Sequence, residues 1–157
     1  MQDALDFIRQ FHTKMDAPIS LNPTLLACDR NASFALADRV STMATETMAA
    51  ASADDVLLRR ASMALEELAE WIAAHAQGDL VAVADAWADR TYVLFGDAVV
   101  TGLPAAMLFD EVHRSNMTKE PAPMRTGKAV KGSKYRPPDI RQALALDSGN
   151  PPRQQNG

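Results

Sequence analysis

The sequence predicts an all-α protein: a bundle of four to five helices, followed by an irregular, basic C-terminal segment. Three observations support this prediction. Apolar residues recur every three or four positions, as one buried helix face requires. No stretch alternates apolar and polar residues for long, so no sheet is expected. Most glycines and prolines stand between the helical stretches rather than within them.

The first 52 residues contain two expected helices. Residues 3–15 carry four apolar side chains at helical spacing, Leu5, Ile8, Phe11 and Met15. Pro18 and Pro23 then bracket a loop. Residues 31–52 are rich in Ala and Met and lack Gly and Pro, which favours a second helix.

Three further helices follow. The third runs to about Gln77, because residues suited to an N-cap precede it and Gly78 follows it. These candidate caps are Ser52, Asp54 and Asp55. The fourth helix covers residues 80–100. The fifth covers residues 104–115, where Pro104 suits the first turn.

Beyond Asn116 the composition changes. Six Gly and Pro residues between there and Pro138 predict an irregular loop. Residues 139–146 have room for one or two helical turns. We expect a single domain over residues 1–146 and a disordered tail over residues 147–157, which contain Gly, Pro, Gln and Asn.

Charge is divided unevenly along the chain. Residues 1–113 hold 7 Lys and Arg against 17 Asp and Glu, whereas residues 114–141 hold 8 against 2. An acidic body suits cations, and a basic segment suits an anion.

Other bulk features restrict the setting. Apolar runs fall far short of the roughly 20 residues that span a membrane, so no membrane partner is expected. No signal peptide is recognised at the N-terminus. The single cysteine, Cys28, cannot form an intramolecular disulfide, which favours the cytoplasm. We expect Cys28 to be a buried small hydrophobe rather than a nucleophile.

Two helices carry the candidate chemistry. The third has a glutamate cluster within about a third of its circumference, formed by Glu66, Glu67 and Glu70. The fourth has Asp85 and Asp89 one turn apart, among apolar residues that run nearly all round and predict burial. A buried ionised aspartate needs a partner. A cation fits better than Arg90, which points about 100° away from Asp89.

These two helices are antiparallel if the connection at Gly78 is short, so five carboxylates can converge on one point. Oxygen ligands suit the hard cations Mg²⁺ and Mn²⁺. Five carboxylates are too many for one ion, which argues for two or more ions or for one carboxylate acting as a base. Zinc is not expected, because the histidines lack ligand spacing. The alternative for the glutamates alone is a solvated helix face.

Three blocks in order resemble a known superfamily. Glu66–Glu70 matches the EExxE motif, Asp85–Gly96 resembles the second acidic helix and Glu111–Lys119 resembles the third block of the all-α nucleoside triphosphate pyrophosphohydrolases. This group includes MazG, the phosphoribosyl-ATP pyrophosphohydrolases and the MazG-like dUTPases. The likeness covers roughly residues 56–141 and is closest to phage and bacterial MazG-like enzymes. It implies a MazG-like bundle in the cytoplasm, the host's if the protein is phage-encoded.

The resemblance also implies roles for the acidic residues. The metal ligands would be Glu67, Glu70 and Asp89. Glu66 would bind a further ion or help to activate water. Many members carry a glutamate where this chain has Ala86, and Asp85 is the substitute one residue earlier.

The third block implies phosphate contacts from Asn116 and Lys119. Lys134 and Arg136 of the basic segment are added as further phosphate contacts, which would neutralise charge on leaving pyrophosphate. The alternative for this segment is a solvated, mobile C-terminus. The implied reaction converts a nucleoside triphosphate and water to a monophosphate and pyrophosphate, with two or more Mg²⁺ ions per site and Glu66 as the first choice of base.

The base pocket is the least defined part of this prediction. Trp71, Trp87 and Tyr92 are the candidate stackers, with a core role as the alternative for each. The phage-like resemblance favours dGTP or GTP, and dUTP is the runner-up. A non-enzymatic helical module with a nucleic-acid-binding tail is the alternative class. We do not expect it, because the tail has one aromatic residue and no reading motif.

Assembly and closure complete the predictions. The apolar surfaces of the third and fourth helices exceed what one short bundle covers, so a homodimer or homotetramer is expected. The segment from Lys119 to Arg136 is interrupted by Gly and Pro and has little apolar content to hold it in place. It should therefore be mobile without ligand and close over the phosphates.

Overall fold

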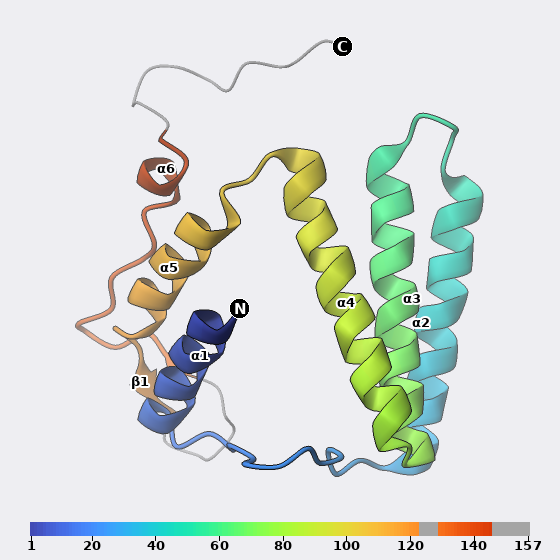
Figure 1. The fold of residues 1–157 in the computed structure, drawn as a ribbon, viewed down its shortest axis with the longest axis horizontal. Coiled ribbons are helices and arrows are strands. Elements are labelled where there is room, and N and C mark those ends of the chain that lie inside the picture. Colours follow the sequence, from blue (N-terminus) through green and yellow to red (C-terminus); the bar gives the residue numbers. More distant parts are fainter. Residues whose placement is uncertain (123–128, 146–157) are drawn as a thin grey trace. The chain divides into compact units, whose positions relative to one another are not determined.

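The computed structural model describes residues 1–122 and 129–145, and these are mostly helical. The prediction of an all-α protein is confirmed (Figure 1). The chain forms two compact units. Residues 22–101 are the three-helix unit, and residues 1–21 with the chain from Gly102 onward are the α5 unit. The predicted disordered tail lies outside the described residues, and a single domain over residues 1–146 stays a prediction.

The three-helix unit consists of long helices that run side by side in Figure 1. They are α2 (Arg30–Ala50), α3 (Val56–Gln77) and α4 (Leu80–Thr101). Asp55 caps α3 by accepting a 2.9 Å hydrogen bond from the N–H of Leu58. Gly78 ends it with a φ of +84°, a conformation that glycine adopts without steric cost. The predicted helix bounds agree with these to within two residues.

Small residues form the contact between α2 and α3. Ala37 and Ala44 are buried on α2, and Ser62, Ala69 and Ala76 are buried on α3. Each set repeats every seven residues, so each forms one stripe along its helix. The Ser62 hydroxyl donates a 2.8 Å hydrogen bond to the carbonyl of Ala44. Side chains this small allow the two helices to approach closely.

Arg60 ties α3 to α4. Its Nε donates to Asp97 at 2.7 Å, and a terminal nitrogen donates to the carbonyl of Val93. Gly96 lies beneath this guanidinium group. A Cβ at Gly96 would stand 2.5 Å from an Arg60 nitrogen, so the guanidinium would have to move if a larger residue stood there.

Helix α4 is not buried all round, and this expectation was wrong. Three of its residues are buried, Val83, Ala86 and Val93. Val81, Tyr92 and Val99 are each about 80% exposed or more. Within its unit α4 packs against α3, which covers one stripe of its surface. Among the described residues, no single helix has the length and apolar composition to span a membrane. Helices α4 and α5 meet these two criteria only when they are counted together, and the chain bends between them.

The segment before α2 is anchored to α3. The N–H of Leu26 donates a 3.2 Å hydrogen bond to Nδ1 of His75, which is buried. Nδ1 therefore carries the lone pair, and the proton of the neutral ring is on Nε2. Cys28 in the same segment is exposed, so the prediction of a buried cysteine is wrong.

The α5 unit contains shorter elements. They are α1 (Gln2–Lys14), α5 (Ala105–Asn116), β1 (Glu120–Pro121), β2 (Ala129–Val130) and α6 (Ile140–Ala143). The Phe7 ring stacks on His113 with 4.5 Å between centroids, and Lys14 donates to the carbonyl of Met117 beyond the end of α5. Strands β1 and β2 pair antiparallel, whereas no sheet was expected in this segment. The pairing is too short to have left a sequence pattern.

Candidate functional site

Helices α3 and α4 bring the five predicted carboxylates into one neighbourhood. Glu67 is partly buried, and burial is the largest cause that raises the pKa of its carboxyl above the ordinary value of 4.5. The negative charges of the other four raise it further. In descending order of effect these are Glu70, Asp89, Glu66 and Asp85.

One oxygen of this group lacks a partner. Oε2 of Glu67 is buried and accepts no hydrogen bond from any described residue. An unsatisfied buried acceptor costs about 1–3 kcal/mol, and more when charged. A cation beside Oε2 would remove this cost and the repulsion among the carboxylates. The all-oxygen donor set and the orphaned oxygen therefore fit a hard divalent cation.

The side chains are not already gathered as a ligand set. Within residues 1–122 and 129–145, no group of three or more His, Cys, Asp or Glu side chains is arranged so that it could hold a metal ion. The convergence of all five carboxylates on one point stays a prediction.

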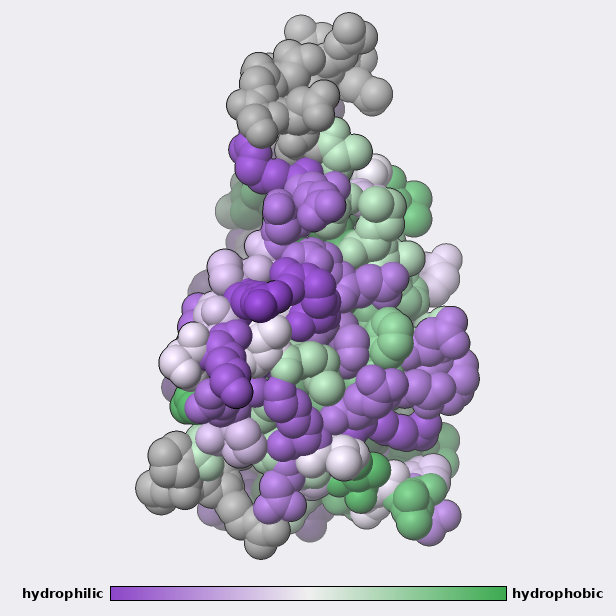
Figure 2. All heavy atoms as spheres, turned by 90° about the vertical axis from the view of Figure 1, so that its left-hand side faces the viewer, coloured by the Kyte–Doolittle hydropathy of each residue, from purple (hydrophilic) through white to green (hydrophobic). Residues whose placement is uncertain are grey.

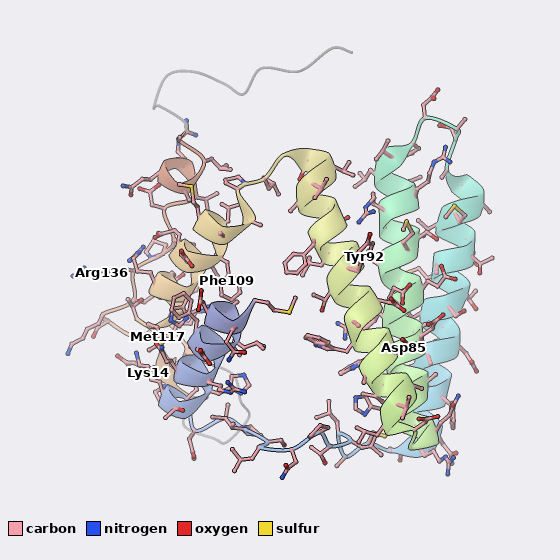
Figure 3. The ribbon with its side chains drawn as sticks, viewed as in Figure 1. Lys14, Asp85, Tyr92, Phe109, Met117 and Arg136 are labelled. Carbon is pink, nitrogen blue, oxygen red and sulfur yellow. The ribbon has the colours of Figure 1, made fainter. Side chains whose placement is uncertain are left out.

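The two aspartates differ from their predicted environment. Both Asp85 and Asp89 are exposed, so burial cannot be the reason that they need a cation. The partly buried charge is that of Glu67 instead. Asp85, labelled on α4 in Figure 3, lines an open hollow of about 490 Å³ together with Glu70 of α3. The rest of this hollow is mostly alanine, which leaves the two carboxylates as its charged groups.

A second, mainly apolar hollow of about 750 Å³ contains two of the three candidate stackers. Trp71 and Trp87 line it together with His75. Trp71 stands edge-on to His75 at 4.7 Å, and the Arg90 guanidinium carbon lies 4.7 Å from the centroid of the Trp71 ring. Arg90 is therefore engaged with an aromatic ring. Sequence reasoning did not find this pair, because the two residues lie on different helices.

Tyr92 does not share this environment. Its side chain is 81% exposed on α4 (Figure 3) and lines none of the hollows described for the three-helix unit. The geometry therefore favours Trp71 over Tyr92 as a stacking surface.

The four predicted phosphate-binding residues all belong to the α5 unit. Asn116 is the last residue of α5 and Lys119 follows it closely, whereas Lys134 and Arg136 come after β2. Within the described residues, the polar ends of these four side chains form no hydrogen bond or ion pair. They remain available for a ligand. Figure 2 shows that the surface on this side of the molecule is mainly hydrophilic.

A polar network, here called the α5 clasp, ties the chain after β2 to the end of α5. Its α5-side residues are Glu111, Arg114, Ser115 and Thr118, which hold the main chain of residues 136–139. Arg114 donates two hydrogen bonds to Glu111, at 2.6 and 2.7 Å, and one to the carbonyl of Pro137 at 3.1 Å. The Asp139 N–H also donates to Glu111. The Arg114 and Asp139 hydrogen bonds lower the pKa of Glu111 to about 2.

Two hydroxyl groups complete the clasp. Ser115, only 1% exposed, donates to the carbonyl of Arg136 at 2.8 Å. The N–H of Arg136 donates to the Thr118 hydroxyl at 2.8 Å. Polar groups rather than apolar ones therefore hold residues 136–139. Mobility of the segment from Lys119 to Arg136 stays a prediction, and the clasp holds only its last residue. A side chain that bonds a distant main chain leaves no sequence periodicity, so Ser115 and Thr118 were missed.

An all-helical protein with clustered carboxylates and a set of unpaired cations fits a class that handles phosphorylated substrates through metal ions. The phosphoribosyl-ATP pyrophosphohydrolase family matches residues 33–116, more than half of the chain, and the chain belongs to this family. The resemblance to MazG-like pyrophosphohydrolases is thereby confirmed, and the chain is a pyrophosphohydrolase for a nucleotide-like substrate. No curated protein and no solved structure matches it.

The match includes some predicted site residues and omits others. It begins within α2 and ends at Asn116, so all five carboxylates lie inside it. Lys119, Lys134 and Arg136 lie beyond it. The role predicted for Lys119 rests on the resemblance in the third block, and those predicted for Lys134 and Arg136 rest on their charge.

Proposed function

We propose that the protein hydrolyses a nucleoside triphosphate to a monophosphate and pyrophosphate, with dGTP or GTP as the favoured substrate and dUTP as the alternative. The observation that carries the proposal is the buried, unpaired oxygen of Glu67 among four further carboxylates. Such a cluster is unfavourable in an empty protein and favourable around Mg²⁺ or Mn²⁺.

The five carboxylates are proposed to act as metal ligands and as a base. The proposed ligands are Glu67, Glu70, Asp85 and Asp89, while Glu66 binds a further ion or acts as the base. Two or more bound Mg²⁺ ions would screen the triphosphate and lower the pKa of an attacking water. As the base, Glu66 would accept the proton of that water. It is exposed on α3 and forms no hydrogen bond or ion pair among the described residues.

The cations of the α5 unit are proposed to act on the phosphates. Hydrolysis breaks the bridge between the α- and β-phosphoryl groups, and the leaving pyrophosphate gains negative charge. Lys119, Lys134 and Arg136 would neutralise that charge, and Asn116 would donate hydrogen bonds. Their lack of partners within the described residues supports this role.

The nucleobase of the substrate is proposed to stack on Trp71. Two indole rings line its hollow, and Arg90 reinforces one face of Trp71. A purine would cover an indole more fully than uracil does, which supports the preference for a guanine nucleotide.

We also propose a homodimer or homotetramer. Val81, Tyr92 and Val99 leave a largely exposed apolar stripe on α4. A second copy would bury such a stripe, as helical bundles commonly do.

The test is a panel of eight NTPs and dNTPs, each incubated with the protein and Mg²⁺ and assayed for pyrophosphate and monophosphate. We expect one guanine nucleotide to react fastest and EDTA to stop the reaction. Release of inorganic phosphate in place of pyrophosphate would contradict the proposal, and so would a failure to hydrolyse any of the eight nucleotides. Salt-sensitive binding to DNA or RNA without hydrolysis would favour the nucleic-acid module instead.

A further inference from the structure

Free and bonded polar groups alternate along one short stretch of the α5 unit. Among the described residues, the side chains of Asn116 and Lys119 form no hydrogen bond or ion pair, whereas Ser115 and Thr118 are bonded within the clasp. The same division is found within Arg136. Its guanidinium has no partner in the described part of the chain, while its N–H and C=O are both bonded. One set of groups fixes the backbone, and the other presents two positive charges and an amide.

The backbone of Arg136 is held on both sides. Its carbonyl accepts from Ser115 and its N–H donates to Thr118, both at 2.8 Å. A hydroxyl has one proton. The Thr118 proton goes to the carbonyl of Ser115 at 2.7 Å, which leaves a lone pair for Arg136. With both amide groups fixed from one helix end, the direction in which the Arg136 side chain leaves the backbone is fixed as well.

The next residues are braced in the same way. Arg114 holds the carbonyl of Pro137, and Glu111 accepts from the N–H of Asp139. Pro137 also fixes its own φ, which limits the freedom of the chain directly after Arg136. Four side chains of the clasp therefore hold residues 136–139, none of which is buried.

We propose that Ser115 and Thr118 are positioning residues, which set the backbone of Arg136 so that its guanidinium meets the substrate phosphates together with Lys119. The inference rests on the proposed function. It adds two residues, Ser115 and Thr118, that act through Arg136 without contacting the substrate. A long side chain that starts from a fixed backbone loses less freedom on binding than one on a mobile loop. Prepositioned cations stabilise developing charge more effectively for the same reason.

The test is a double-mutant cycle between Thr118 and Arg136. Thr118→Val removes the hydroxyl and keeps the shape, and Thr118→Ser keeps the hydroxyl as the matched control. We expect Thr118→Val to lower kcat/KM for the best nucleotide by about tenfold, or roughly 1.4 kcal/mol. Thr118→Ser should stay within about twofold of wild type. In an Arg136→Ala background, Thr118→Val should cost less than about twofold further.

A purely stabilising clasp gives a different pattern. Thr118→Val would then lower the melting temperature and reduce kcat/KM by the same factor with or without Arg136. That additive result would overturn the positioning role and leave the proposed function intact, provided that Arg136→Ala itself slows hydrolysis.

Calorimetric titration with inorganic pyrophosphate and Mg²⁺ gives a readout that needs no hydrolysis. Thr118→Val should weaken pyrophosphate binding in the wild-type background and not in the Arg136→Ala background. Unchanged pyrophosphate affinity in Thr118→Val, or no binding to the wild-type protein, would overturn the inference. Failure of the proposed function would appear separately, as a wild-type protein that binds pyrophosphate and hydrolyses no nucleotide.

Discussion

The two units of the molecule carry net charges of opposite sign. The forces that stabilise each unit internally also differ. Residues 22–101 hold 5 Lys and Arg against 12 Asp and Glu, a net charge of −7, and their helices pack through small apolar stripes. The α5 unit, residues 1–21 and 102–157, holds 11 Lys and Arg against 8 Asp and Glu, a net charge of +3, and the clasp there is made of hydrogen bonds. The difference separates a proposed cation site on rigid helices from a proposed phosphate site on a polar scaffold.

The largest effect should come from the carboxylate with the unpaired oxygen. Glu67→Gln should reduce Mg²⁺-dependent hydrolysis at least about 100-fold, or roughly 2.7 kcal/mol of transition-state stabilisation. The same change should raise the melting temperature without metal, because it removes a charge that is partly buried among like charges. Initial rates and thermal melts in EDTA measure the two effects.

Two comparisons sharpen this prediction. Glu46→Gln removes an exposed acid on α2 outside the cluster and should change neither quantity. Asp89→Asn should also lower the rate of Mg²⁺-dependent hydrolysis strongly, but with a smaller gain in stability, since Asp89 is exposed. A Glu67→Gln protein with wild-type turnover would remove the basis of the proposed cation site.

The next effect concerns packing in the three-helix unit. Gly96→Ala should be about 1 kcal/mol less favourable in the wild type than in an Arg60→Ala background, because the new methyl group moves the Arg60 guanidinium away from Asp97 and Val93. Urea unfolding measures the free energy of unfolding in each case. In the Arg60→Ala background, which is the control, the substitution should stabilise the protein by about 0.5–1 kcal/mol, because alanine is favoured over glycine in a helix interior. The same gain in both backgrounds would mean that Arg60 accommodates the methyl group without losing its contacts.

The contrast between the units also explains what the sequence could predict. The bounds of α3 and α4 follow from periodicity, and the residues that cap and end α3 follow from their types, so these features were predicted nearly to the residue. The convergence of the five carboxylates on one point stays a prediction. Burial of α4 was predicted wrongly, because an apolar circumference does not say whether its own chain or a second copy covers it. The clasp left no signal, because Ser115 and Thr118 bond to a backbone 18 to 21 residues away.

The exposed stripe of α4 offers a smaller effect, on assembly. Tyr92→Glu with Val99→Glu should weaken self-association at least about tenfold, since both side chains are 81% exposed in the single chain and a partner would have to bury the new charges. Light scattering over a dilution series measures the mass. Leu57→Glu, at 77% exposure on α3, is a control for added charge alone. A wild-type mass of 17.0 kDa at micromolar concentration would exclude the assembly.

The smallest effect concerns the clasp and depends on pH. The folded pKa of Glu111 is about 2 and its ordinary value is 4.5, so the unfolded chain takes up a proton first as pH falls. The stability that Glu111 adds is therefore complete above pH 4.5 and is lost between pH 4.5 and about 2. Glu111→Gln should melt below the wild type at pH 7, and the difference should vanish near pH 2. Glu46→Gln should show no comparable convergence. A wild-type advantage over Glu111→Gln that stays constant from pH 7 to 2 would mean that the Glu111 carboxylate does not hold Arg114 and Asp139 in solution, and that the other hydrogen bonds alone keep residues 136–139 against α5.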